Sequence, residues 1–200
     1  MQTIARWVPR FLLFGLLAGI VSGCGVNDIP TYDEAVKAAW AQVDNQYKRR
    51  ADLIPNLVEV VKGYATQEQD TLTAVVEARA KATQMQIPGD ILSNPQAFQQ
   101  FQENQGALTQ ALSRLMVVVE RYPDLKSNQN FLSLQAQLEG TENRIAVARR
   151  DYIQAVQVYN TELRTFPGRI WAAILYSDMQ PRETFSQPES LAEPPQVNFN

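Results

Sequence analysis

Few side chains in this 200-residue sequence could perform acid–base or nucleophilic chemistry. The sequence contains no histidine, which removes the commonest general base and the commonest metal ligand. Nucleophile–histidine pairs, zinc motifs and Glu-x-x-His di-iron sites are excluded for the same reason. Only carboxylates remain, and the pair Glu139 and Glu142 has a spacing that is common on solvated helices. We therefore expect no enzyme, no cofactor and no metal site, and a carboxylate-based enzyme is the weakest function class kept open.

The single cysteine, Cys24, has a specific chemical use. Residues 1–10 carry two arginines and no acid, and residues 11–21 read FLLFGLLAGIV. This is the layout of a secretory signal, and the apolar run is shorter than the roughly 20 residues of a membrane-spanning helix. The string VSGC that ends at Cys24 resembles the bacterial lipobox, which implies cleavage before the cysteine and a lipid on its sulfur. The sequence therefore predicts a lipoprotein signal peptide at 1–23.

Lipidation of Cys24 would fix the location of the protein. An acylated chain outside the cytoplasm is held on a membrane, and residues 24–31 would form a short spacer between the anchor and the fold. Gly25 stands where such lipoproteins usually carry aspartate when they stay in the inner membrane. This favours the outer membrane or the periplasmic face over the cytoplasmic membrane. The balance of 18 basic and 21 acidic residues lacks the basic excess of a nucleic-acid-binding protein, so nucleic acid is not an expected partner.

The apolar pattern predicts an all-α fold. Residues with the three-four spacing of a helix seam run from Val36 to Tyr64 and onward, with Arg50 in the one gap. A second helix opens at the cap pair Asn94–Pro95, and Gln105 takes the one missing position of its seam. A third seam extends from Phe131 to Phe166. We expect an antiparallel up-and-down bundle of long helices with a short C-terminal helix.

Pro55 complicates the first helix. An interior proline costs about 3 kcal/mol, because it removes a hydrogen bond and clashes with the preceding turn, whereas in a first turn it is harmless. Asp52 could cap such a new helix. We therefore expect a bend or break at Asp52–Pro55, although the unbroken apolar phase favours one continuous helix.

The two alternatives at Pro55 differ in what covers Trp40. A continuous helix would leave Trp40 in water unless a fold-back or a second copy of the chain covers it, so a homo-oligomer stays open. With a break, Trp40 belongs to the core. In either case the pattern predicts a helical bundle over 32–177 and a proline-rich, loosely ordered tail over 178–200.

The string that begins at Ala39, AWAQVDNQYKRRADLIPNLVEVVKGYA, resembles the LemA family. The match continues through Tyr122–Lys126, Thr141–Glu142 and Phe166–Pro167. The resemblance implies a helical bundle carried on an amino-terminal membrane segment, outside the cytoplasmic membrane, with a poorly defined biochemical role. This chain departs from that pattern where the lipobox cysteine replaces a longer membrane span.

Polar and aromatic residues on or beside the helix seams are the candidate interaction residues. They could bind a partner, or they could form a mutually satisfied network that fixes the register between helices. The function that we expect is that of a membrane-anchored, non-enzymatic scaffold or interaction protein with unidentified envelope partners. The alternative is a binder of an apolar envelope molecule, a lipid or a cell-wall fragment, between the helices. The candidate residues are Trp40, Arg50, Asp52, Asn56, Glu139, Glu142, Arg149 and Asn160.

Overall fold

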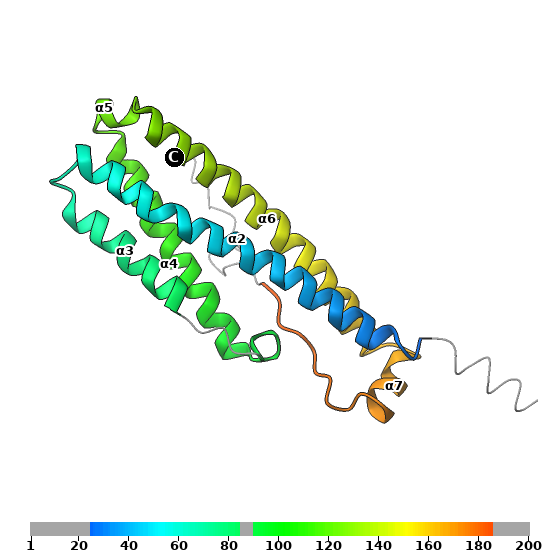
Figure 1. The fold of residues 1–200 in the computed structure, drawn as a ribbon. Helices are drawn as coiled ribbons and strands as arrows, with labels where there is room; N and C mark the ends of the chain where they lie inside the picture. The colour runs from blue at the N-terminus through cyan, green and yellow to red at the C-terminus, as the bar shows by residue number, and fades with distance from the viewer. Residues whose placement is uncertain (1–24, 85–89, 186–200) are drawn as a thin grey trace, which may run out of the picture. The chain divides into compact units, whose positions relative to one another are not determined.

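The fold is all-α, as the sequence predicts. The computed structural model describes residues 25–84 and 90–185, so the expected signal peptide and Cys24 lie outside the described residues. Within the described ranges there is no strand, and no helix is long and apolar enough to cross a membrane. The elements, drawn in Figure 1, are α2 (Asp28–Tyr64), α3 (Gln69–Gln84), a short 3-10 helix (Ile91–Ser93), α4 (Pro95–Val119), α5 (Pro123–Lys126), α6 (Gln129–Glu162) and α7 (Gly168–Ile174).

Two of the helix starts follow directly from capping residues in the sequence. The side chain of Asn94 accepts a hydrogen bond from the backbone amide of Ala97 at 3.1 Å, and Pro95 takes the first helical position of α4. Asn128 serves α6 in the same way, accepting from the amide of Phe131 at 3.1 Å. Both caps satisfy amides that have no partner within their own helix. The predicted short C-terminal helix is α7.

Helix α2 runs through Pro55 without a break, so of the bend or break expected at Asp52–Pro55 the break is wrong. Proline removes the amide that would bond to the carbonyl of Ala51. Arg79 on α3 replaces that donor, since its Nε donates to the Ala51 carbonyl oxygen at 2.8 Å. The chain turns later, over residues 65–68, where the amide of Glu68 donates to the carbonyl of Ala65 at 3.1 Å.

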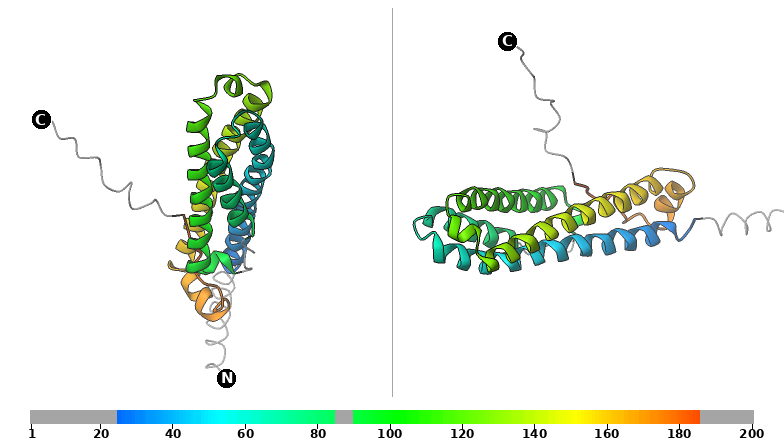
Figure 2. Two further views of the ribbon diagram at one scale, coloured as in Figure 1. Left: turned by 90° about the vertical axis from the view of Figure 1, so that its left-hand side faces the viewer. Right: turned by 90° about the horizontal axis from the view of Figure 1, so that it is seen from above.

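The chain divides into two compact units, and both α2 and α6 contribute to each of them. In its described part, unit 1 comprises residues 25–38 and 154–182, and unit 2 comprises residues 39–84, 90–153 and 183–185. In unit 2, α3 and α4 lie side by side (Figures 1 and 2). One apolar core there takes side chains from each of the helices α2 to α6, among them Leu57 of α2, Val75 of α3, Leu115 of α4, Leu125 of α5 and Phe131 of α6.

In unit 1, residues 180–182 are bound to helix side chains. Tyr159 donates its hydroxyl to the carbonyl of Gln180 at 3.2 Å. The Asn160 side chain pairs with the backbone of Arg182, donating at 2.9 Å and accepting at 2.8 Å. The guanidinium of Arg182 donates to Asp33 at 2.6 and 2.9 Å. The start of the segment that we expected to be a loosely ordered tail is therefore held by specific hydrogen bonds.

Candidate functional site

The centre of unit 2 is built around a buried cation, Arg50, whose residue is only 1% exposed. Its Nη1 donates to Glu142 at 2.9 Å and to the Thr109 hydroxyl at 3.0 Å. Its Nη2 donates to the side-chain oxygen of Gln105 at 2.7 Å and to the backbone carbonyl of the same residue at 3.2 Å. A buried charge needs such partners, because desolvation without them is costly. The cluster therefore fixes α2 against α4 and α6.

The helix seams explain why this cluster forms. Arg50 and Gln105 are the polar exceptions in the apolar seams of α2 and α4, and the structure brings the two exceptions into contact. Thr109 follows Gln105 by one helical turn, and its hydroxyl donates to the Gln105 carbonyl at 3.0 Å. Sequence reasoning did not select Gln105 or Thr109. The feature that could have pointed to Gln105 was its polar side chain at a position of the apolar seam. No sequence feature pointed to Thr109.

A cavity of about 300 Å³ lies beside this cluster, and its lining includes Tyr47, Arg50, Glu142, Arg149 and Phe185. The Arg149 guanidinium stands 4.4 Å from the centroid of the Phe185 ring. Burial raises the pKa of Tyr47, so its hydroxyl stays protonated at neutral pH. Within the described residues, Nε of Arg50 is buried and has no hydrogen-bond partner. The lining of the cavity thus combines two arginines, one carboxylate and aromatic rings, and each arginine lies over a ring.

A larger groove, of about 630 Å³, lies between α4 and α6. Its apolar lining comprises Leu112, Met116 and Leu138, of which Leu112 and Leu138 are buried and Met116 is half-buried. Two acids, Glu139 and Glu142, stand in the same lining. The groove therefore combines an apolar floor with acidic groups.

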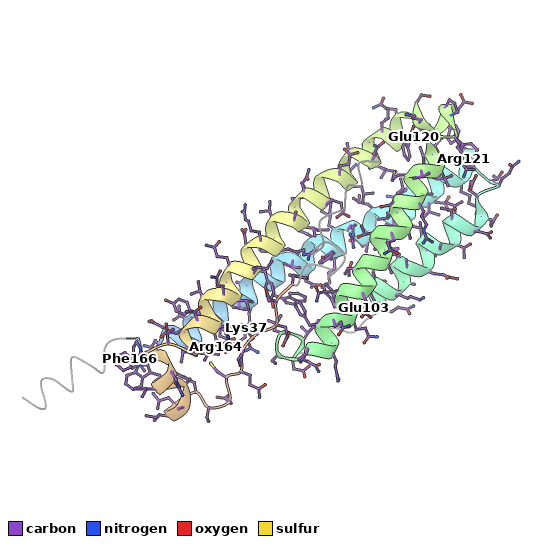
Figure 3. The ribbon with its side chains drawn as sticks, turned by 180° about the vertical axis from the view of Figure 1, so that it is seen from behind. Lys37, Glu103, Glu120, Arg121, Arg164 and Phe166 are labelled. Carbon is purple, nitrogen blue, oxygen red and sulfur yellow. The ribbon has the colours of Figure 1, made fainter. Side chains whose placement is uncertain are left out.

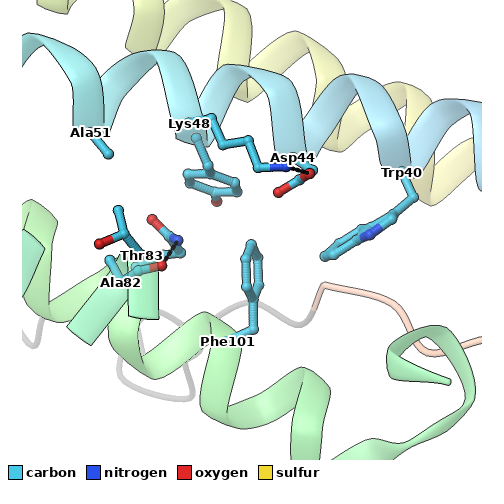
Figure 4. A pocket seen from close by; sticks show the side chains of 9 residues that line it. Trp40, Asp44, Lys48, Ala51, Ala82, Thr83 and Phe101 are labelled. Carbon is cyan, nitrogen blue, oxygen red and sulfur yellow. Dashed lines mark hydrogen bonds and ion pairs between the residues drawn. The ribbon is translucent and has the colours of Figure 1, made fainter. Parts of the chain in front are cut away.

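Figure 4 shows a third hollow, of about 300 Å³, where rings from α2 and α4 meet. The indole of Trp40 and the ring of Phe101 face it, and Lys48 is paired with Asp44 at 2.6 Å on its wall. Because Lys48 and Asp44 are paired with each other, the hollow offers its rings together with the polar side chains of Thr83 and Gln105.

Trp40 belongs to an aromatic cluster, so it is covered although α2 is continuous. Its ring centroid lies 5.1 Å from that of Phe101, 5.4 Å from Tyr152, 5.7 Å from Phe98 and 6.3 Å from Phe185. From the sequence alone, a covered Trp40 requires a broken helix, a fold-back or a second copy of the chain. Side chains of α4, α6 and the segment after Arg182 cover it in one chain. Phe185 is 7% exposed, and sequence reasoning missed it because it placed this residue in the tail.

The remaining candidate residues are placed elsewhere. Asp52 and Asn56 are exposed on α2, and no hydrogen bond joins them to the Arg50 cluster among the described residues. Glu139 is exposed and accepts from Gln135 at 2.9 Å. Asn160 lies in unit 1 and holds Arg182. Of the eight residues, Trp40, Arg50, Glu142 and Arg149 therefore gather at the centre of unit 2.

The charged and aromatic groups gathered at the centre of unit 2 could bind a ligand. The carboxylate of Glu142 is engaged by Arg50, and a general base must be free to reach the proton of a substrate. In the part of the chain that the structure describes, no group of three or more acidic or cysteine side chains could hold a metal ion. The cavity and the groove instead offer shape, apolar area and charge.

Known proteins resemble this chain over most of its length. Magnetosome proteins MamQ 1 and MamQ 2 of Paramagnetospirillum magneticum are each 27% identical over 167 residues, which cover 74% of this chain and 60% of the relative. Protein LemA of Metamycoplasma hominis is 23% identical over 140 residues, 70% of this chain and 60% of the relative. The match thus spans less than two thirds of these relatives. The model of the LemA family matches residues 39–199, and the chain belongs to the LemA family.

Proposed function

We propose that this protein is a non-enzymatic interaction protein of the cell envelope, held on a membrane through a lipid on Cys24. Its binding site would be the groove between α4 and α6, and its ligand an amphipathic segment of a partner protein. The observation that carries this proposal is the groove itself, which has an apolar floor, an acidic lining and about 630 Å³ of space. The two terminal nitrogens of the neighbouring cation, Arg50, already donate to Glu142, Gln105 and Thr109.

The chemistry of the groove selects the kind of partner. Apolar floors between helices accept the apolar face of an amphipathic helix, whose anchors repeat every three to four residues. The acids Glu139 and Glu142 favour lysine or arginine beside those anchors, because opposite charges across an interface improve registration and the rate of association. Glu142 is 40% exposed in its side chain, so it can meet a partner while it holds Arg50.

The start of the fold supports a short tether. Helix α2 begins at Asp28, so the spacer is shorter than the 24–31 segment that we expected. Three residues, Gly25 to Asn27, separate Cys24 from the helix, and they span at most about 10 Å when fully extended. A lipid on Cys24 would therefore keep the folded chain close to the membrane, at the outer membrane or the periplasmic face.

The groove is tested by crosslinking in cells. A photoreactive residue at Ser113, which lines the groove, should capture a partner protein, and the same residue at Gln110, exposed on the same helix, should not. Glu139→Lys should weaken that capture by reversing a charge in the groove. Glu103→Lys is the matched control, because Glu103 also accepts from a glutamine four residues earlier, at 2.9 Å. Equal capture at 110 and 113, or equal effects of the two reversals, would reject the groove.

The tether is tested separately. Cells fed with an alkyne-tagged fatty acid should label the wild-type chain and leave Cys24→Ser unlabelled. An unlabelled wild type would reject the lipid, whatever the groove binds.

A lipid or a cell-wall fragment is the second candidate ligand, favoured by the floor of Leu112, Met116 and Leu138. The discriminating measurement is mass spectrometry of the intact protein released gently from membranes. A bound small molecule that is lost on Leu138→Glu would favour this reading over a protein partner.

A further inference from the structure

We infer that unit 1 carries a membrane-docking surface formed by Phe166, Ile170, Ile174 and Leu175, here called the α7 patch, which inserts into the interface of the bilayer that holds Cys24. The inference rests on the proposed lipid tether. It adds a second, non-covalent contact between the protein and lipid, and it fixes which part of the chain faces the membrane.

The α7 patch is an unusual concentration of exposed apolar side chains. Phe166 is 80% exposed, Ile174 68%, Leu175 55% and Ile170 44%. All of them fall within ten consecutive residues, and Ile170 and Ile174 lie one helical turn apart on α7, on the same face. Single exposed apolar residues are normal, but a contiguous group marks a surface that contacts another body or a membrane.

The first described residue, Gly25, lies close to this patch. A Cβ placed on Gly25 would stand 3.5 Å from Cγ of Pro167, the residue bonded to Phe166. Consecutive Cα atoms are about 3.8 Å apart, so Cys24 follows within one residue of this contact. Acyl chains on Cys24 would enter the bilayer beside the α7 patch, and the patch would then lie at the membrane surface.

The patch is also held in place. At Gly168 the backbone approaches the carbonyl oxygen of Glu162 so closely that any Cβ would collide with it, which packs the start of α7 on the end of α6. After α7 the chain is bound again, through the hydrogen bond from Tyr159 to Gln180. Because both ends of the segment are fixed, its side chains present a defined surface.

The charges beside the patch suit a lipid surface. Arg164 and Arg169 are both exposed, and Figure 3 shows Arg164 near Phe166. Basic residues next to inserted apolar side chains are attracted to anionic headgroups. An anchored bilayer is therefore the occupant to which the geometry points, rather than a protein that would have to displace it.

The test uses the full, acylated chain in vesicles of phosphatidylethanolamine and phosphatidylglycerol. An environment-sensitive fluorescent amino acid at position 174 should be quenched severalfold by brominated lipids. The matched control carries it at Val117, which is equally exposed, at 69%, and should be quenched little. Quenching at 174 that equals that at 117 would overturn the inference, because the patch would then remain in water or beneath another protein segment.

A variant checks that the patch itself causes the insertion. Phe166→Ser with Ile174→Asn, labelled at Ile170, should lose the quenching that the Ile170 label shows in the otherwise unchanged chain. Retained quenching would overturn the inference. The intact mass of each preparation reports the lipid on Cys24, so failure of the tether is seen as a missing mass increment. Failure of the patch is seen as absent quenching in an acylated chain.

Discussion

Arg79→Met removes the donor that compensates for Pro55 while it keeps most of the side-chain volume. The Ala51 carbonyl, which accepts from Nε of Arg79 at 2.8 Å, would lose its partner in a residue that is only 3% exposed. An unsatisfied buried acceptor costs about 1–3 kcal/mol. We therefore expect Arg79→Met to lower the free energy of unfolding by about 2 kcal/mol, measured by urea denaturation followed by circular dichroism.

The decisive measurement is the double-mutant cycle with Pro55→Ala. Alanine at position 55 restores an amide that can bond to the Ala51 carbonyl and removes the clash of the proline ring. It also lets the unfolded chain explore more conformations, so the net gain should be about 1–2 kcal/mol. Arg79→Met should then cost about 1 kcal/mol less in the alanine background than in the proline background. An equal cost of Arg79→Met in both backgrounds would refute the compensation by Arg79.

Four further substitutions test the two units. Trp40→Asp should abolish cooperative unfolding, because it places a charge among Phe98, Phe101 and other rings, at a cost above about 4 kcal/mol; a folded monomer by circular dichroism and gel filtration would contradict this. Arg50→Met should lower the free energy of unfolding by about 1–3 kcal/mol in urea denaturation. Glu142→Gln should lower it less, because the Glu142 side chain is 40% exposed and water can replace part of its contact. An equal or larger loss for Glu142→Gln would contradict this order. Burial raises the pKa of Asp33, but hydrogen bonds from Lys37 and Arg182 outweigh it and hold the pKa below its ordinary value. The stabilisation by the Asp33 carboxylate is therefore complete above about pH 4, the ordinary pKa range of the carboxyl, and is lost as pH falls through the lowered pKa. In Asp33→Asn this loss should be missing when the free energy of unfolding is measured against pH. A free energy of unfolding that falls at acid pH as steeply as in the wild type would contradict this prediction.

Local pattern determined the helical class of this protein and several of its boundaries. The three-four spacing of apolar residues depends only on neighbours along one helix, so it predicted long helices and no strands. Cap residues act within one turn, so Asn94 and Pro95 marked the start of α4 correctly. The same local reading identified Arg50 and Gln105 as exceptions in two seams, and both proved to belong to the central cluster.

Only the tertiary structure decided how these elements meet. Pro55 is tolerated because a donor 28 residues from Ala51 in sequence fills the missing hydrogen bond, and no local rule includes Arg79. The turn at 65–68 contains neither glycine nor proline, and the nearest such residue, Gly63, lies before it within α2, so the sequence did not mark the turn itself. Phe185 lies in a proline-rich stretch that composition assigns to a loose tail, yet it packs on Phe98 with ring centroids 5.1 Å apart. For Pro55 and Phe185 the stabilising partner is distant along the chain, and its contribution arises only when the helices pack.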